Sequence, residues 1–165
     1  ITATGLATKR KANGGIYADS NGLYIFDTIK QVSVQFDKIN ATLTNITGLS
    51  FDLEAGKSYR FKASLIVDAN AVGGHQYCIS GGCTATTIIY QIDSIDNALN
   101  AWIINSRETA LGGAAGQAGA VTIRTEINGI ITVNAAGSLT VQFAQNVAGG
   151  TSSVLVGSYF LVEEV

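Results

Sequence analysis

From about Gln31 onward, hydrophobic and polar residues alternate in short segments that glycine residues separate. The clearest segment spans residues 57–67, where polar Arg60, Lys62 and Ser64 stand between apolar neighbours. A period of two over a whole run indicates a β-strand with one buried face, because successive side chains of a strand point to opposite sides. The apolar face of this predicted strand consists of Tyr59, Phe61, Ala63, Leu65 and Val67.

The same pattern recurs along the chain and predicts an all-β protein, a single antiparallel sandwich or barrel of about eight or nine strands. Some predicted segments are halves of one bent strand, and no stretch has the pattern of a helix of three turns. The predicted segments are 31–36, 40–46, 49–53, 57–68, 75–80, 85–92, 100–104, 120–127, 130–134, 138–146 and 153–163.

Two connections have distinct signatures. Asn128-Gly129 lies between two β-prone runs and predicts a hairpin with a type I′ turn, since that turn needs positive φ at both central residues. Residues 105–119 are rich in glycine and alanine, which predicts a long loop.

Residues 1–30 differ in kind from the rest of the chain. They carry three consecutive basic residues, followed by glycines and an aromatic cluster. We interpret them as an arm that leads into a single β-sandwich domain of residues 31–165. The residues that mark this arm are Lys9, Arg10, Lys11, Tyr17, Tyr24 and Phe26.

The last predicted strand is apolar on both faces. A strand with one solvated face alternates apolar and polar residues, so a strand that is apolar on both sides is covered on both sides. Either residues 1–30 fold over the second face within the same chain, or a neighbouring subunit covers it, and the logic of exposed apolar patches favours the subunit. Val156, Phe160 and Val162 form one face, and Leu155, Tyr159 and Leu161 form the predicted interface.

Composition narrows the class of protein. A chain of 165 residues can bury roughly 70% of its unfolded surface in one domain. Its charged share of 13% excludes disorder driven by charge. A net charge of −2 gives no case for binding nucleic acid, which usually selects basic domains. Apolar runs are too short to predict a membrane span, and residues 1–11 lack the apolar region of a signal peptide.

Candidate chemistry is sparse. His75 is the single histidine, and with two cysteines it falls short of the three or four ligands that a zinc site usually needs. Asp93 and Asp96 lie in a stretch that lacks the glycine and the closing glutamate of a calcium loop. No Gly-x-Ser-x-Gly motif is present to form a nucleophile elbow. The sequence therefore predicts no catalytic residue, no metal site, no cofactor and no enzyme activity.

Cys78 and Cys83 flank a glycine turn. Paired positions across a hairpin can reach disulfide distance, with Cα atoms about 4.4–6.8 Å apart. A disulfide between Cys78 and Cys83 and two free thiols are both compatible with the sequence.

Several segments, in their order and spacing, resemble a recurrent domain of tailed-phage virion structural proteins, whose fold is similar to the tumour-necrosis-factor and complement head domains. The resemblance covers about residues 40–165 and leaves residues 1–39 outside it. The segments that carry it are 47–51 (TGLSF), 55–59 (AGKSY), 73–74 (GG), 127–129 (ING), 133–137 (VNAAG), 137–146 (GSLTVQFAQN) and 154–160 (VLVGSYF).

The resemblance implies a jelly roll that assembles as a homotrimer, in which the strand around Gly157 packs at the three-fold axis through Leu155, Tyr159 and Leu161. It implies a virion protein located on the capsid surface or on a tail appendage. We expect a capsid decoration protein that the arm attaches to the major capsid protein or another virion protein, with no nucleic-acid or membrane partner. The alternative is the receptor-binding tip of a tail or head fibre, whose loop 105–119 contacts the host.

Overall fold

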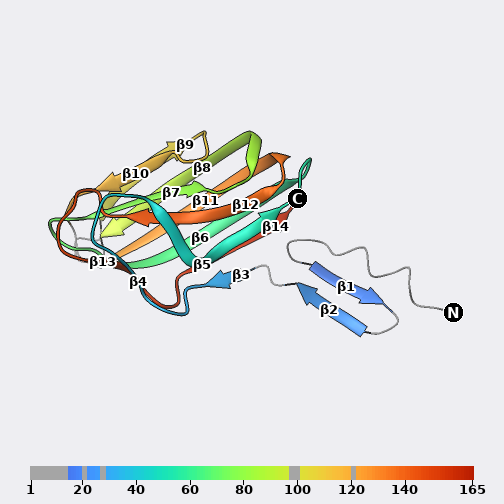
Figure 1. Ribbon diagram of the computed structural model, residues 1–165, viewed down its shortest axis with the longest axis horizontal. Helices are drawn as coiled ribbons and strands as arrows, with labels where there is room; N and C mark the ends of the chain where they lie inside the picture. Colours follow the sequence, from blue (N-terminus) through green and yellow to red (C-terminus); the bar gives the residue numbers. More distant parts are fainter. Residues whose placement is uncertain (1–14, 20–21, 27–28, 97–100, 120–121) are drawn as a thin grey trace.

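The computed structural model describes residues 15–19, 22–26, 29–96, 101–119 and 122–165, with side chains from residue 29 onward. All regular elements in these ranges are β-strands (Figure 1). They are β1 (Gly15–Asp19), β2 (Gly22–Phe26), β3 (Ile29–Gln31), β4 (Phe36–Lys38), β5 (Thr44–Leu53), β6 (Ser58–Asp68), β7 (His75–Ser80), β8 (Thr84–Asp96), β9 (Ala101–Glu108), β10 (Ala114–Gln117), β11 (Thr122–Ala135), β12 (Gly137–Ala144), β13 (Ser152–Val154) and β14 (Tyr159–Glu164).

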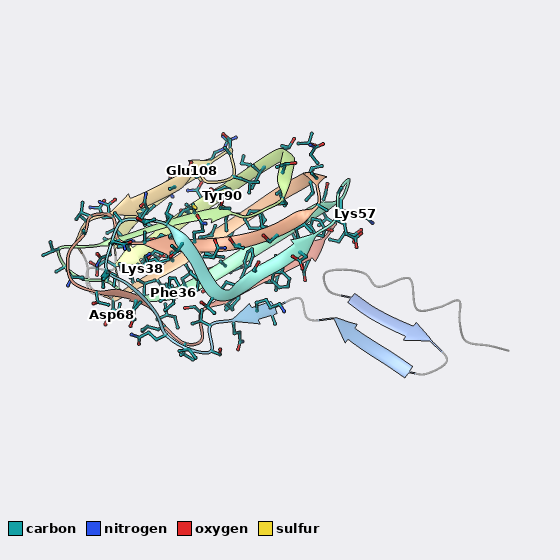
Figure 2. All side chains as sticks on the ribbon, in the orientation of Figure 1. Phe36, Lys38, Lys57, Asp68, Tyr90 and Glu108 are labelled. Carbon is teal, nitrogen blue, oxygen red and sulfur yellow. The ribbon has the colours of Figure 1, made fainter. Side chains whose placement is uncertain are left out.

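The predicted all-β class is confirmed, and the strands from β3 onward form two antiparallel sheets. One sheet has four strands in the order β10-β7-β12-β5. The other has eight, with the main path β3-β14-β6-β11-β8-β9, and with β13 pairing both β6 and β4. β6 runs the length of the larger sheet, with Lys57 just before its start and Asp68 at its far end (Figure 2).

The core lies between the two sheets. Each of the five apolar residues predicted for the buried face of β6 is at most 3% exposed, so that prediction is confirmed. Phe51 of β5 packs edge-on against Phe160 of β14, with ring centroids 5.6 Å apart. Phe61 of β6 contacts Phe160 at 6.3 Å and Tyr90 of β8 at 6.2 Å. Full burial of one such side chain stabilises the fold by about 1.5–3 kcal/mol.

The hairpin predicted at Asn128-Gly129 is wrong, because β11 runs straight through both residues. Asn128 pairs with Lys62, and Gly129 pairs with Phe61 of β6 and with Tyr90 of β8. A Cβ atom on Gly129 would lie 2.5 Å from the Phe61 ring and 2.5 Å from Cβ of Tyr90. Glycine therefore stands there because two large neighbours fill the space that a side chain would need.

The segment 105–119 is also not a long loop. β9 extends to Glu108 and β10 begins at Ala114, which leaves five connecting residues. The Tyr90 hydroxyl donates to the carbonyl oxygen of Gly113 and holds this connection against the body of the domain. Long-range pairing thus converts most of a glycine- and alanine-rich stretch into strand.

Other predicted boundaries change where glycine bends the chain. The segments 40–46 and 49–53 are one strand, β5, in which Gly48 has a φ of 89°. The last strand is divided at Gly157, whose φ is 91°, into β13 and β14. The predicted strand 31–36 is instead a connection between β3 and β4.

The predicted arm contains a separate hairpin. β1 pairs with β2 in register Tyr17↔Tyr24, and this two-stranded sheet stands apart from the sandwich (Figure 1). Lys9, Arg10 and Lys11 lie outside the described residues. The predicted domain boundary after residue 30 falls within β3, which already belongs to the eight-stranded sheet.

Candidate functional site

The outer face of the eight-stranded sheet carries the densest group of charged and exposed apolar side chains. These residues alternate with the core residues of the same strands, so strand periodicity directs them away from the core. The outer face includes Arg60, Lys62, Ser64 and Ile66 of β6, Ile89, Gln91, Asp93 and Ile95 of β8, Arg124, Glu126, Asn128 and Ile130 of β11, and Tyr159, Leu161 and Glu163 of β14.

Glu126 is the centre of the polar part of this face. Its Oε1 atom accepts hydrogen bonds of 2.7 Å from Ser64 Oγ and from a guanidinium nitrogen of Arg124, and Lys62 Nζ lies 2.9 Å from Oε2. Burial acts to raise the pKa of Glu126, but the bonds from Ser64, Lys62 and Arg124 outweigh it and hold the pKa below its usual value. The carboxylate therefore stays charged and fixes three neighbouring side chains.

Exposed apolar side chains flank this polar centre. Ile130 is 54% exposed and pairs with Ile89 across β11 and β8. At the other end of the face, Ile66 lies beside the chain that enters β14, and Trp102 on β9 is 62% exposed. Trp102 pairs with Ile95 of β8, and an exposed tryptophan is typical of an interaction surface, because tryptophan is among the types that contribute most binding energy at interfaces.

The structure brings together two of the three predicted interface residues. Tyr159 and Leu161 lie on the outer face, opposite Ser64 and Lys62 of β6, and both are half-buried. Leu155 precedes β14 in a turn and is not part of that strand.

The continuous strand predicted for residues 153–163 is therefore wrong, and Gly157 is the reason. The left-handed conformation at Gly157 breaks the alternation, so that Val156 is 57% exposed although Phe160 and Val162, predicted to share its face, are buried. The Ser158 hydroxyl stabilises the break by accepting the backbone N–H of Ile66 at 2.9 Å.

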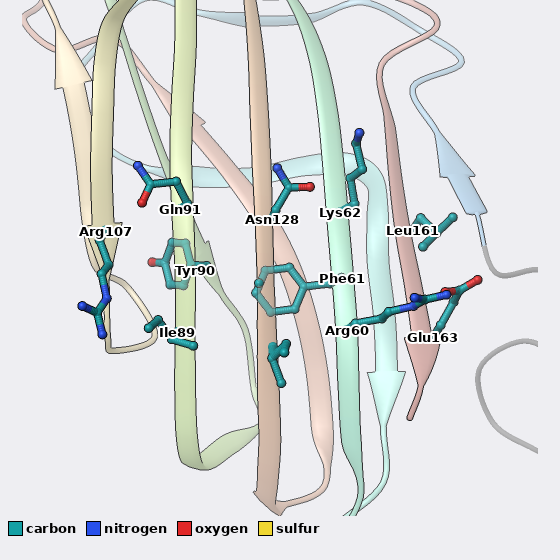
Figure 3. A pocket seen from close by; sticks show the side chains of 12 residues that line it. Arg60, Phe61, Lys62, Ile89, Tyr90, Gln91, Arg107, Asn128, Leu161 and Glu163 are labelled. Carbon is teal, nitrogen blue, oxygen red and sulfur yellow. The ribbon is translucent and has the colours of Figure 1, made fainter.

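A shallow groove of about 720 Å³ crosses the outer face (Figure 3). Leu161, Ile130 and Ile89 provide apolar surface, whereas Gln91, Asn128 and Arg107 provide groups that can hydrogen-bond to a ligand. Arg60 and Lys62 at the groove are engaged in ion pairs with Glu163 and Glu126 respectively. Sequence analysis missed this groove, because its residues come from five strands that are paired only in the folded sheet.

A second polar cluster is buried inside the sandwich. His75 and Tyr77 of β7 point inward toward Ser94 and Asp96 of β8, and the Ser94 hydroxyl bonds to Thr125 at 2.7 Å. Neither ring nitrogen of His75 has a hydrogen-bond partner among the described residues. Burial lowers the pKa of His75 to about 4, although the nearby charge of Asp96 acts to raise it.

No metal-binding group assembles among the described residues. Within these ranges, no three His, Cys, Asp or Glu side chains come close enough to hold an ion. Asp93 accepts hydrogen bonds from Gln91 at 3.1 Å and Asn105 at 2.9 Å on the outer face, whereas Asp96 points into the core. The two aspartates considered for calcium therefore lie on opposite faces of β8. The described part of the chain also contains no helix long and apolar enough to cross a membrane.

Cys78 and Cys83 are both buried free thiols, so the disulfide considered from sequence is not formed in this structure. Cys78 lies on the outer face of the four-stranded sheet, where its thiol bonds to Gln142 Oε1 at 3.1 Å. Cys83 belongs to the core. Burial raises the pKa of Cys78 to about 11 and also raises that of Cys83, which disfavours the reactive thiolate.

No protein-family model and no curated protein matches this chain. Among solved structures, it is similar to a chain of the infectious bursal disease virus Gt strain at 13% identity and a TM-score of 0.22, covering 94% of this chain and 48% of that chain. The VP2 subviral particle of infectious bursal disease virus matches at 11% identity and a TM-score of 0.21, covering 90% of this chain and 43% of that chain. A chain of the infectious bursal disease virus Gx strain matches at 13% identity and a TM-score of 0.19, covering 90% of this chain and 44% of that chain. The chain spans less than half the length of each, and TM-scores of this size carry no argument about fold or function.

Proposed function

We propose that this protein is a non-enzymatic structural component of a virion, built as a jelly roll. The observation that carries the proposal is the strand order, with β5-β12-β7-β10 in one sheet and β3-β14-β6-β11 in the other. This is the interleaved order of two Greek keys, and the β8–β9 hairpin is an insertion between β7 and β10. Double-sheet jelly rolls recur in viral capsid and lectin domains, and the sequence resemblance to phage virion proteins favours the first class.

The protein acts as a homotrimer that uses the outer face of the eight-stranded sheet. Tyr159 and Leu161 supply apolar surface beside the ion pairs of Glu126, so apolar contact and directional polar contact occur together. Mixed surfaces of this kind suit protein–protein contact, in which an apolar centre excludes water and polar groups set the orientation.

Residues 1–30 attach the trimer to the particle. The basic residues Lys9, Arg10 and Lys11 meet an acidic surface of the major capsid protein or of another virion protein. The function we favour is capsid decoration, with the trimer on the capsid surface. The alternative is the receptor-binding tip of a tail or head fibre, and the groove lined by Gln91, Asn128 and Arg107 is the observation that favours it.

Assembly is tested by sedimentation of the full chain and of Leu161→Glu, with Ser50→Glu as the matched control. Ser50 is exposed on β5 of the other sheet, so its variant adds the same charge away from the proposed interface. We expect a trimer for the full chain and the control, and a folded monomer for Leu161→Glu. A monomeric full chain contradicts the trimer.

Decoration and receptor binding are separated on particles. Deleting residues 1–28, which spares β3, is expected to abolish incorporation into the particle. Particles without the protein are then fragile to heat or osmotic shock yet still adsorb to cells. Loss of adsorption by particles that remain equally robust favours the receptor-binding alternative.

A further inference from the structure

Three connections between strands meet at one end of the sandwich. They are here named the loop end, and they span residues 39–43, 69–74 and 145–151. The backbone N–H of Gln145 donates to the carbonyl oxygen of Asn40 at 3.0 Å, and that of Val147 donates to the carbonyl oxygen of Gly73 at 3.1 Å. These bonds hold the three connections against one another. The loop end lies beside β13, and the C-terminus lies at the opposite end of the sandwich (Figure 1).

The loop end combines exposed aliphatic side chains with a complete lack of charge. Its sequences are INATL, ANAVGG and QNVAGGT, and none contains Asp, Glu, Lys or Arg. Each connection exposes one aliphatic side chain, since Ile39 is 66%, Val72 67% and Val147 45% exposed. The opposite end differs, because Lys57 forms an ion pair there with Glu164. Exposed apolar side chains gathered in one place mark an interaction surface.

Side chains within the loop end bind much of its own backbone. Asn70 Oδ1 accepts the N–H of Val72 at 2.9 Å and that of Gly73 at 3.0 Å. Gln145 donates from Nε2 to the carbonyl oxygen of Gly149 at 2.9 Å and accepts the N–H of Gly149 at 3.1 Å. Backbone groups that are bonded internally can enter a medium that offers no hydrogen bonds, where an unsatisfied group is costly. The loop end is therefore suited to contact with lipid.

The single tryptophan of the chain lies near the same end. Trp102 is exposed and pairs with Ile95 of β8. Through Arg124 of β11, Ile95 lies level with Ile66 of β6, shortly before the connection 69–74. Tryptophan is enriched where proteins meet the membrane–water interface, because its ring is apolar and its N–H is polar. Trp102 is thus a second feature that points to a bilayer.

We propose that the loop end binds the surface of a phospholipid bilayer, with Ile39, Val72 and Val147 entering the apolar layer. A protein partner is disfavoured, because the three connections lack the aromatic residues and arginine that dominate binding energy between proteins. Lys38 and Asp68 lie at the ends of β4 and β6, directly before two of the connections (Figure 2). These charges limit entry to the connections themselves, so the contact is peripheral and driven by apolar area.

This partner goes beyond the structural role proposed above and departs from the expectation of no membrane contact. That expectation followed from the lack of one long apolar run, whereas the loop end assembles from segments far apart in sequence. β3 runs toward the loop end, from Ile29 level with Lys62 to Gln31 level with Ser64. The chain therefore enters the sheet from the opposite direction, and an arm that attaches to a particle leaves the loop end accessible.

The test is binding of the full chain to phosphatidylcholine vesicles, measured by flotation and by the fluorescence of Trp102. Val72→Asp places a charge on the loop end. Val165→Asp is the matched control, because Val165 is 70% exposed and lies beside Ser58 at the opposite end. We expect the full chain and the control to bind with a blue shift of the emission, and Val72→Asp to bind at least tenfold more weakly. Urea unfolding of the three proteins should coincide, since both valines are exposed.

Salt and lipid charge separate apolar contact from electrostatic attraction. Binding that is unchanged by salt or by added phosphatidylglycerol supports the proposal. Binding that needs phosphatidylglycerol and is lost at high salt overturns it, because basic residues elsewhere in the chain then carry the contact.

Equal binding by Val72→Asp and the full chain also overturns the proposal, as does a full chain that binds no vesicles. If Val72→Asp fails to enter particles and the full chain ignores vesicles, the loop end contacts a protein instead. That result rejects the bilayer and leaves the proposed role in the virion intact.

Discussion

The buried histidine makes a quantitative prediction about acid stability. His75 is 0% exposed, and neither of its ring nitrogens has a partner among the described residues. Its pKa falls from 6.5 to about 4 because burial disfavours the charged ring. The perturbation that isolates this effect is His75→Phe, which keeps an aromatic ring beside Tyr77, whose ring centroid is 5.3 Å away.

The direction in which stability changes with pH follows from proton binding at His75 in the folded and unfolded chains. Between pH 6.5 and about 4 the unfolded chain binds a proton at His75 and the folded chain does not, so stability falls as the pH falls through this window. Above pH 6.5 His75 is neutral in both the folded and the unfolded chain. Below about pH 4 it is charged in both, so the loss of stability is then complete. At 1.36 kcal/mol per pKa unit, the loss amounts to about 3 kcal/mol.

The assay is urea unfolding of the full chain and of His75→Phe at a series of pH values from neutral to below 4. Carboxylates that do not interact with His75 are shared by both proteins and cancel in the difference of unfolding free energies, whereas Asp96, whose charge acts on His75, contributes to that difference. We expect the natural chain to lose about 3 kcal/mol more than the variant across the window, with no such trend above it. Parallel pH profiles would refute the assignment of a buried neutral histidine.

Three further predictions concern the core, the outer face and the thiols. Gly129→Ala is expected to lower the free energy of unfolding by about 1–3 kcal/mol, because its Cβ would meet Phe61 and Tyr90, and Phe61→Leu in the same chain should recover part of the loss in chemical unfolding. Glu126→Gln removes the ion pairs with Lys62 and Arg124, whose side chains are half-exposed. Thermal unfolding should therefore show a loss of stability below about 1 kcal/mol that disappears at high salt. A loss of stability that persists at high salt contradicts an electrostatic origin. A reducing agent should leave the melting temperature unchanged, since Cys78 and Cys83 are free, and a fall in the melting temperature would reveal a disulfide.

Local periodicity predicted most of the individual strands. Along β6, residues that alternate between Tyr59 and Val67 are all buried, as the sequence requires of a strand with one solvated face. The inward positions of β12, Leu139, Val141 and Phe143, follow the same rule. Two of the three predicted interface residues lie on the outer face for this reason, because Tyr159 and Leu161 alternate with the buried Phe160 and Val162.

Pairing between distant strands lay beyond the sequence pattern. The ion pairs of Glu126 join β6 to β11, and nothing in the alternation of either segment says that they are neighbours. The prediction of a hairpin at Asn128-Gly129 was wrong for a related reason. Its turn signal is local, whereas the need for glycine arises from Phe61 and Tyr90 on the two flanking strands.

The chain by itself thus determined most of the strands and which face of each is apolar, because side-chain alternation is a property of single strands. Tertiary structure alone decided which strands are neighbours, where β14 begins after Gly157, and which half of β8 pairs with β9 as well as with β11. Those features depend on how twisted strands close around a shared core, and residues such as Gly129 and Glu163 acquire their roles only when segments far apart in sequence meet.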